Sequence, residues 1–249
     1  MSVRRQLAGA AGLAAFLAVW QAVATSGVVA SSLLPPPSAL PATFASELAL
    51  GFWPEMVAAS LRHYVVGLIV GSVLGVVVGA AVALFPRFDA AQAWVARILR
   101  PIPPLAWIPF AIIWFGVTET AAAFIIAIGI FWINYFTAHA AVRAVDADLI
   151  ELARAFGHGS LKARLTKVVL PGAMPGLLSG LRAGLGQGWM TVVAAELFGI
   201  TGIGQRMMEA AGLLATEVVL VYMLTIALLY GVSDMAFVAV QTRVLRWQR

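Results

Sequence analysis

The 249-residue sequence contains no cysteine, so disulfide bonds, zinc–thiolate sites and cysteine nucleophiles are excluded. Charged residues make up only 11% of the chain, whereas soluble globular proteins have about 25%. Neither of its two lysines, Lys162 and Lys167, follows a glycine, so the chain has no ATP-binding P-loop. The three histidines show no H-E-x-x-H spacing, and we expect no metal site.

Hydrophobic residues are abundant instead, at 62% of the chain, above the roughly 45–50% of soluble proteins. This composition excludes an ordinary soluble enzyme and a disordered protein, and it excludes a nucleic-acid binder despite the sequence pI of about 10.2. A membrane serine protease would need a serine paired with a histidine, and we interpret Ser72 and Ser233 as packing residues. The composition indicates an integral membrane protein without enzymatic chemistry of its own.

Six apolar stretches of spanning length recur along the chain. A membrane-crossing helix needs about 20 apolar residues. The sequence predicts an all-α polytopic protein, one transmembrane domain over 1–249, with spans at 7–30, 61–85, 99–116, 120–138, 174–199 and 217–241. Arg4-Arg5 and the later Ala22-Val23-Ala24 also fit a cleaved signal peptide. We favour a retained first helix, because its apolar run is long and its removal would place the C-terminal arginines on the opposite side.

Basic residues gather in the segments on one side of these spans. They number 13 of the 16 lysines and arginines: Arg4, Arg5, Arg87, Arg97, Arg100, Arg143, Arg154, Lys162, Arg164, Lys167, Arg243, Arg246 and Arg249. The other side carries Glu47, Glu55, Glu119 and Glu209, with Arg206 as its one clear basic residue. Cytoplasmic loops carry an excess of Lys and Arg, so we expect both termini in the cytoplasm.

Proline and glycine mark three features of the spans. Leu34-Pro35-Pro36-Pro37-Ser38 predicts a stiff extended link, followed by an amphipathic helix over 39–56 that breaks near Pro54. The prolines from 101 to 109 predict a kinked or irregular start of the third span. Glycines at every fourth position from Gly67 to Gly79 predict a seam where two helices approach closely.

The connection over residues 139–173 is the longest and most charged on the basic side. Asp148 and Glu151 predict a capped helix start. An apolar stripe follows between residues 149 and 156, with Arg154 on the polar face. This pattern predicts a short amphipathic helix in the loop.

Gly157 and Gly159 predict the end of that helix, and Ser160 can cap a second, basic helix over 161–169. We expect the second helix to end at Leu170-Pro171-Gly172. The two helices would then meet at a glycine elbow on the cytoplasmic face. A basic helix resting on anionic lipid headgroups and a docking knob for a soluble partner are the two interpretations of this elbow.

The same residues carry a family resemblance. Glu151-Leu152-Ala153, then Gly157, then Leu170-Pro171 resembles the EAA loop of ABC-importer permease subunits. The chain departs from that pattern at Leu152, which replaces the middle alanine, and in the Gly157–Pro171 spacing, which is one residue longer. Further stretches are similar to the sulfonate, taurine, nitrate and bicarbonate branch: 34–38, 100–109, 114–116, 145–149, 188–196 and 245–247. The resemblance covers essentially the whole chain.

The resemblance implies a type I importer permease fold in a bacterial inner membrane, with six transmembrane helices and a cytoplasmic coupling helix. It implies a homodimer, two ATP-binding cassette subunits that hold ATP and Mg²⁺, a substrate-binding protein and a small oxyanion as solute. The chain itself would bind no cofactor and no nucleic acid. The residues expected to contact the ATPase are Asp148, Glu151, Ala153, Arg154, Phe156, Gly157, His158, Leu170 and Pro171.

The fifth span carries an unusual polar load for a bilayer segment. Its path candidates are Arg182, Gln187, Trp189, Thr191 and Glu196, with Asn134, Tyr135 and Arg62 as weaker candidates elsewhere. Arg182 and Glu196 lie about 21 Å apart along a helix and about 40° apart around it. They would share one face, since intramembrane ionisable residues usually turn inward. Snorkelling of Arg182 and Glu196 to the two interfaces is the alternative, and Arg62 could either steer an anion or pair with Glu55.

An ion-coupled secondary transporter or channel independent of ATP is the rival interpretation of the whole chain. It needs membrane-embedded acids for coupling, and Glu196 and Asp234 are its only good candidates. It has no need of an ordered cytoplasmic elbow.

Overall fold

A computed structural model describes residues 3–248, which form helices and connecting segments without any strand; Arg249 lies outside the described residues. The long helices are α1 (Val3–Thr25), α3 (Phe52–Leu84), α6 (Glu119–Arg143), α9 (Leu170–Glu196) and α11 (Thr216–Val244). The shorter helices are α2 (Leu40–Ala49), α4 (Pro86–Leu99), α5 (Ile108–Phe115), α7 (Ala147–Ala155), α8 (Leu161–Arg164) and α10 (Ile203–Gly212). Short 3-10 turns cover Pro37–Ala39, Pro104–Trp107 and Arg246–Gln248, and a π-helical turn covers Leu165–Val169.

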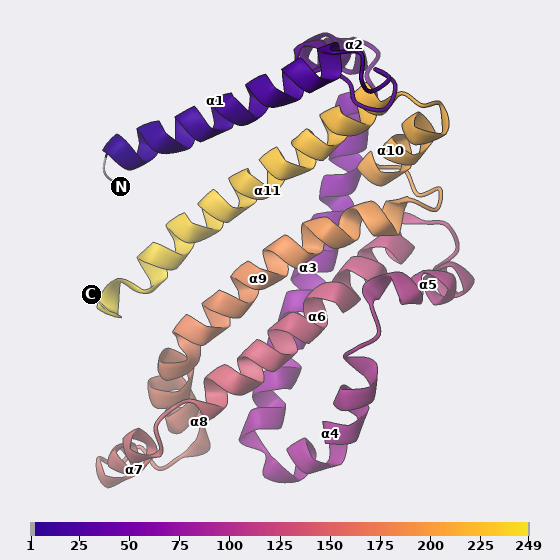
Figure 1. The fold of residues 1–249 in the computed structure, drawn as a ribbon. Coiled ribbons are helices and arrows are strands. Elements are labelled where there is room, and N and C mark those ends of the chain that lie inside the picture. The colour runs from indigo at the N-terminus through magenta and orange to yellow at the C-terminus, as the bar shows by residue number, and fades with distance from the viewer. Residues whose placement is uncertain (1–2, 249) are drawn as a thin grey trace.

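The long helices form a bundle in which α9 lies between α6 and α11, with α3 packed behind them (Figure 1). Helices α10, α2 and α5 lie toward one end of the bundle, here called the α10 end. Helices α7 and α8 lie at the opposite end, called the α7 end. The five long helices, with α9 counted from Leu161, are long and apolar enough to cross a membrane.

The third predicted span is wrong as a single helix over 99–116. Helix α4 already ends at Leu99, and the segment Pro104–Phe115 is bent by 91° from it, so a sixth span exists only if this bent pair counts as one. The cause is Pro101, Pro103 and Pro104, which lack N–H donors and disfavour helical geometry in the residues before them; Pro103, before Pro104, is extended at ψ 147°. The expected irregular backbone at this position is confirmed.

The break near Pro54 is also wrong. Helix α2 ends at Ala49 and α3 begins at Phe52, with Gly51 between them at φ 80°, a conformation that favours glycine. Pro54 lies in the first turn of α3, where its missing N–H breaks no helical hydrogen bond. Helix α3 is therefore 33 residues long and begins nine residues before the predicted span.

The glycine seam of α3 is confirmed as the contact with α6. A Cβ at Gly67 would lie 2.6 Å from Ile126 Cγ2, and one at Gly71 would lie 2.5 Å from the Ala127 carbonyl oxygen. A Cβ at Gly75 would lie 2.6 Å from the Phe131 carbonyl oxygen. The two backbones approach so closely that only glycine fits between them.

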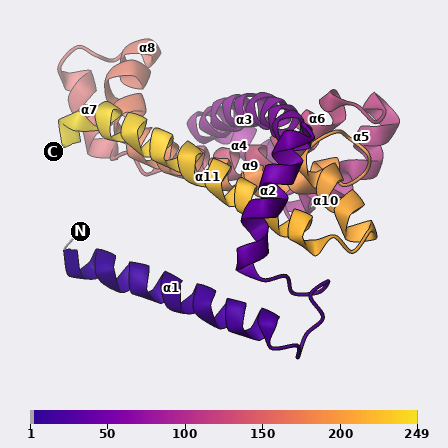
Figure 2. The same ribbon diagram turned by 90° about the horizontal axis from the view of Figure 1, so that it is seen from above.

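Helix α1 lies apart from the rest of the bundle (Figures 1 and 2). Only 6% of its spanning window is buried, and Phe16 and Val19 are exposed. Its described polar contacts lie at its C-terminal end, where Trp20 donates to the Pro35 carbonyl at 3.0 Å and Gln21 to Ser38 at 3.1 Å.

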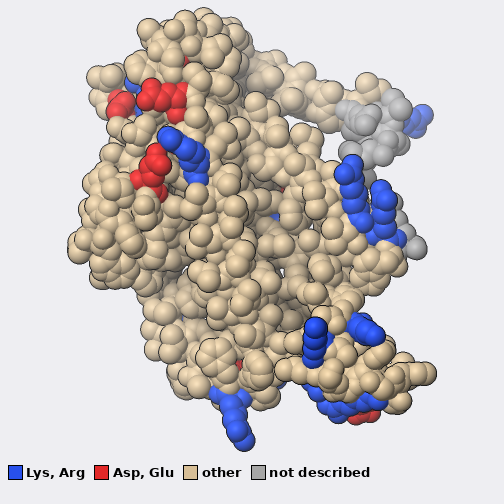
Figure 3. Space-filling model, turned by 180° about the vertical axis from the view of Figure 1, so that it is seen from behind, with Lys and Arg blue, Asp and Glu red and all other residues tan. Residues whose placement is uncertain are grey.

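Charge separates along the bundle. Seen from behind, most of the visible Lys and Arg side chains lie toward the α7 end and near the C-terminus, and most of the visible Asp and Glu lie toward the α10 end (Figure 3). The structure thus collects at one end the basic segments that the sequence assigns to one side.

Candidate coupling elbow and translocation face

The elbow begins at helix α7, and its cap differs from the predicted one. Asp146, not Asp148, is the N-cap, and its carboxylate accepts a hydrogen bond from the Asp148 N–H at 3.0 Å. Asp148 therefore lies in the first turn, where its charge complements the helix dipole. Glu151 and Arg154 are exposed on the outer surface of this helix.

The glycine elbow itself is confirmed. Gly157 has φ 80°, which ends the helix in the left-handed conformation. The N–H of His158 donates to the Ala153 carbonyl at 2.8 Å, and the N–H of Gly157 donates to Arg154 at 3.0 Å. Ser160 then caps the next helix by accepting from the Ala163 N–H at 3.2 Å.

The elbow presents an apolar knob, defined here as Leu149, Leu152 and Phe156. These side chains occupy positions i, i+3 and i+7 of one helix face and are exposed, Phe156 to 74%. Ala153 lies on the same face of α7 and is buried. The knob and Ala153 line one side of a groove of about 600 Å³ between α7 and the start of α9, and Pro171 and Trp247 line it as well.

The second elbow helix does not end at Leu170-Pro171-Gly172 as predicted. It passes through the π-helical turn at Leu165–Val169 and continues as α9 to Glu196, 36 residues in all. Pro171 has no N–H and its ring would clash with the carbonyl four residues earlier in a regular helix. A π turn holds one residue more than an α turn, so it makes room for Pro171 and absorbs the extra residue in the Gly157–Pro171 spacing.

One side of α9 is covered by other parts of the described chain only along its edges. This surface, called the open face, contains Ser179, Arg182, Ala183, Gly186, Gln187 and Met190, all exposed or half-buried. Met190 is 75% exposed. The open face lies between α6 and α11 and continues into a cavity of about 380 Å³ that Gln187 shares with Trp132, Thr137 and the proline segment 103–104.

Arg182 pairs with Asp234 of α11 on this open face. Its Nε donates to Asp234 Oδ1 at 2.7 Å, and its Nη2 donates to Oδ2 at 2.8 Å. The side chains remain 47% and 21% exposed. Sequence reasoning considered both residues separately and missed the pair, because nothing in a separation of 52 residues indicates a contact.

The other polar residues of α9 point into the bundle. Trp189 is 2% exposed and stacks on Tyr64 with ring centroids 4.3 Å apart. Thr191 is 2% exposed, and its hydroxyl donates to the Gln187 carbonyl at 2.8 Å. Both residues support the inner wall of α9 and leave the open face to Arg182 and Gln187.

The two candidates on α6 are buried as well. Asn134 donates to Ser72 at 3.3 Å and to the Ile130 carbonyl at 3.2 Å. The Tyr135 hydroxyl donates to Gln92 of α4 at 2.6 Å. These bonds connect α6 to α3 and α4.

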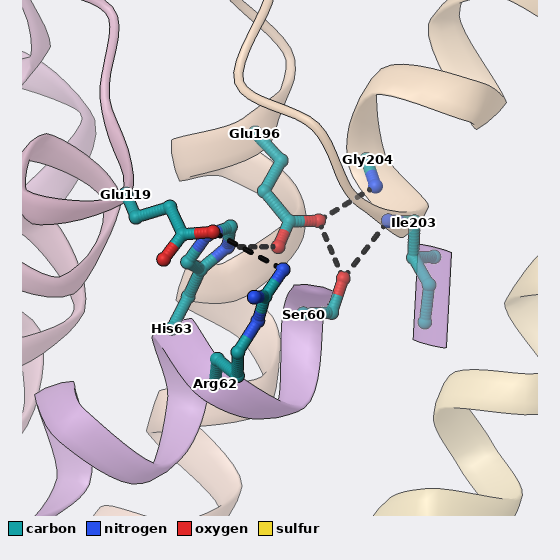
Figure 4. A network of polar contacts seen from close by, with 7 residues as sticks. All are labelled: Ser60, Arg62, His63, Glu119, Glu196, Ile203 and Gly204. Atoms are coloured by element: carbon teal, nitrogen blue, oxygen red, sulfur yellow. Dashed lines mark hydrogen bonds and ion pairs between the residues drawn. The ribbon is translucent and has the colours of Figure 1, made fainter. Parts of the chain in front are cut away.

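Glu196 lies at the centre of a buried network at the α10 end (Figure 4). Its carboxylate is 0% exposed and accepts from Ser60 Oγ at 2.8 Å, from the Gly204 N–H at 2.9 Å and from His63 Nδ1 at 2.9 Å. Ser60 accepts in turn from the Ile203 N–H at 2.9 Å. We assign the Nδ1–H tautomer to His63, which makes it the donor to this carboxylate. The network fixes the N-terminus of α10 to α3 and α9.

Arg62 pairs with Glu119 and not with Glu55. The two groups lie 3.1 Å apart and are about 60% exposed. Figure 4 shows this pair beside His63. Together with His63 and Thr120, the two residues line a cavity of about 190 Å³ at the α10 end. The pairing follows from the α3–α6 contact, which brings the start of α6 beside Arg62.

An ion pair between buried Glu47 and half-buried Arg206 at the α10 end was not found from the sequence. Glu47 of α2 accepts from Arg206 of α10 at 2.6 and 3.1 Å and from the Tyr222 hydroxyl at 2.9 Å. Burial alone would raise the pKa of Glu47, but the hydrogen bonds from Arg206 and Tyr222 lower it below its ordinary value. Glu47, Arg206 and Tyr222 together connect α2, α10 and α11. The only sequence signal for this contact was that Arg206 is the one clear basic residue on the acidic side.

The acids required by an ion-coupled transporter therefore both have partners. Glu196 accepts three hydrogen bonds, and Asp234 is bonded to Arg182. Among residues 3–248, no group of three or more His, Asp and Glu side chains could hold a metal ion.

Comparison with known proteins shows the family of the chain and agrees with the fold. The profile of the family described as "Binding-protein-dependent transport system inner membrane component" matches residues 67–249. The taurine transport system permease protein TauC of Escherichia coli K12 is 36% identical over 242 residues, which cover 94% of this chain and 87% of TauC. The putative aliphatic sulfonates transport permease protein SsuC of the same strain is 32% identical, covering 93% and 88%. The bicarbonate transport system permease protein CmpB of Synechococcus elongatus is 34% identical, covering 78% and 73%.

Solved structures share the fold. An inward-facing structure of the MetNI methionine ABC transporter matches with a TM-score of 0.59 at 20% identity, covering 77% of this chain and 95% of that one. A crystal structure of an amino acid ABC transporter matches with a TM-score of 0.58 at 15% identity, covering 82% and 97%. This chain belongs to the family of binding-protein-dependent transport system inner membrane components, the non-catalytic permease subunits of ABC transporters.

Proposed function

We propose that two copies of this chain form the translocation path of an ATP-driven importer for a small oxyanion. Each copy would bind one ATPase subunit, which holds ATP and Mg²⁺, through its elbow. A substrate-binding protein would deliver the solute at the α10 end. The relatives named for taurine, aliphatic sulfonates and bicarbonate carry chemically different solutes that share a compact oxyanion group.

The observation that carries this proposal is the continuity of one helix from the elbow to the open face. Residues 161–196 form a single helical segment, about 54 Å long at 1.5 Å per residue. The knob of Leu149, Leu152 and Phe156 directly precedes this segment and would contact a soluble partner. The middle of the segment carries Arg182 and Gln187 on the open face, which α11 and α6 cover only at its edges.

The charge distribution supports an orientation with both termini in the cytoplasm. The basic α7 end would face the cytoplasm, in accordance with the excess of Lys and Arg in cytoplasmic loops (Figure 3). The elbow would then lie on the side where ATP is available. The Glu119–Arg62 pair and α10 would lie on the outer side.

The predicted path residues divide into two groups in this proposal. Arg182 and Gln187 line the path, and Arg62 lies at its outer mouth. Trp189, Thr191, Glu196, Asn134 and Tyr135 hold the helices that form the wall, since each is buried within the bundle.

Elbow variants test the coupling. Glu151 and Gly157 are exposed, and no Cβ clash occurs at Gly157, so their substitution leaves packing intact. Glu151→Lys reverses a charge on the docking surface, and Gly157→Val forces a β-branched residue into φ 80°. We expect both variants to insert into the membrane and to lose substrate-stimulated ATP hydrolysis when the purified complex is assayed with its binding protein.

The matched control is Gly159→Ala, at a nearby glycine with open space around it and no positive φ. It should retain coupled ATP hydrolysis. Wild-type hydrolysis rates in both elbow variants would show that the ATPase docks elsewhere. Failure of the wild-type chain to co-purify with an ATPase would contradict the importer proposal itself.

A further inference from the structure

The Arg182–Asp234 pair lies in the middle of two spanning helices. Arg182 is 12 residues from the start of α9 and Asp234 is 10 residues from the end of α11. These separations correspond to about 18 Å and about 15 Å along the helices. Ionisable groups at such depth face a bundle interior or water, because exposure to hydrocarbon is costly. The half-exposed pair therefore lies in a space that lipid does not fill.

The surroundings of the pair leave the guanidinium accessible. Gly186, one turn further along α9, has no side chain, and Tyr230 of α11 lies there, 3.5 Å from the position of a Cβ. Ala183 and Ser179 on the same face are small. No large side chain of α9 covers Arg182 from the open face.

Asp234 uses only one edge of the guanidinium. Arginine has five N–H donors in a planar fork. The carboxylate takes one from Nε and one from Nη2. Among the described residues, Nη1 has no hydrogen-bond partner, so two of its N–H groups and one of Nη2 remain free on the outer edge. Such an edge matches two oxygens of an oxyanion.

We propose that Arg182 is the oxyanion-binding residue of the translocation path and that Asp234 positions it. The sulfonate group of the solute binds the free Nη1–Nη2 edge. Asp234 holds the guanidinium plane toward the open face and neutralises the arginine while the path is empty. This inference rests on the proposed importer function and names the site at which the solute group binds.

Because Arg182 binds the anion and Asp234 only positions it, variants of the two residues should affect uptake differently. Arg182→Lys keeps a cation that can pair with Asp234 but lacks the planar fork. The double variant Arg182→Gln with Asp234→Asn replaces the ion pair by a neutral amide pair of similar size. Asp234→Asn alone keeps an acceptor for Arg182 and removes only its charge. Met235→Leu, at the exposed neighbour of Asp234, is the control.

The assay uses the complete complex in proteoliposomes with its binding protein and radiolabelled 2-aminoethanesulfonate. Co-purification of the ATPase subunits reports assembly separately from transport. We expect Arg182→Lys to assemble and to raise the apparent KM for uptake about tenfold or more, because one charge-assisted bidentate contact is lost. Asp234→Asn should raise it less, and the neutral double variant should take up no solute.

Uptake of ethanesulfonate, which has no amine, identifies the group that Arg182 binds. Arg182→Lys should impair uptake of ethanesulfonate as much as uptake of 2-aminoethanesulfonate, because the binding protein is the same in wild type and variant. A defect confined to the solute with the amine would overturn the assignment of the sulfonate to Arg182.

Three other results would also overturn the inference. They are an unchanged KM in Arg182→Lys, wild-type uptake by the neutral double variant, and loss of assembly in both, which would make the pair a folding contact. In each case a wild-type complex that hydrolyses ATP in response to its binding protein would leave the importer function standing.

Discussion

Replacing Glu196 by alanine tests whether its carboxylate is structural. The substitution removes the acceptor of three buried donors: Ser60 Oγ, the Gly204 N–H and His63 Nδ1, at 2.8, 2.9 and 2.9 Å. Each unpaired buried donor costs about 1–3 kcal/mol. Because three donors lose their acceptor, we expect a loss of at least about 3 kcal/mol in the free energy of unfolding.

Glu196→Gln provides a graded comparison. The amide keeps one oxygen as an acceptor, but its NH₂ group then faces a donor of the network. The expected loss is about 1–3 kcal/mol. The matched control is Glu209→Ala on α10, where the carboxylate is 50% exposed and lies 3.6 Å from Arg206. Such exposed pairs contribute about 0–1 kcal/mol.

The measurement is unfolding by sodium dodecyl sulfate in mixed micelles, with uptake measured on the same preparations. The predicted order of stability is wild type and Glu209→Ala, then Glu196→Gln, then Glu196→Ala. A Glu196→Ala variant as stable as Glu209→Ala, yet without uptake, would refute this reasoning. It would show that the carboxylate serves the translocation path directly.

Two further predictions concern packing and pH. Gly71→Ala should lower the stability of the chain by about 1–3 kcal/mol, because its Cβ would lie 2.5 Å from the Ala127 carbonyl oxygen; Gly231→Ala, with nothing within 4 Å, is the control in the same unfolding assay. The lowered pKa of Glu47 stabilises the folded state fully above the ordinary value of 4.5, and this contribution disappears as the pH falls through the lower folded-state pKa. The stability difference between wild type and Glu47→Gln should therefore be constant at neutral pH and shrink below 4.5, and a difference independent of pH would contradict the ion pair with Arg206.

Local sequence patterns predicted those features of the fold that depend on residues close together in the chain. The apolar runs predicted the long helices, and the four-residue glycine spacing predicted the α3–α6 seam. Gly157 predicted the elbow, because a left-handed helix end favours glycine whatever surrounds it. The cap was misplaced by two residues, since Asp146 and Asp148 fit a cap equally well and only the backbone distinguishes them.

Contacts between distant segments could not be predicted in this way. Glu196 lies 133 residues from His63, and Arg182 lies 52 residues from Asp234. A helical angle between Arg182 and Glu196 does not say which neighbouring helix covers each of them. Helices α3 and α10 enclose Glu196 at one end of α9, whereas α11 covers only one edge of Arg182.

The one extra residue between Gly157 and Pro171 can be related to the π turn at Leu165–Val169. One residue added to a regular helix would rotate everything after it by about 100°, which would turn Arg182 away from the open face or the elbow away from its partner. A π turn takes up the added residue with little rotation of the helix beyond it. The turn lies where Pro171 removes a helical hydrogen bond, and Pro175 removes another about one turn later in α9. A displacement of the elbow must therefore be absorbed between Leu165 and Pro175 or be carried along α9 to Arg182, and the rigidity of this stretch decides which.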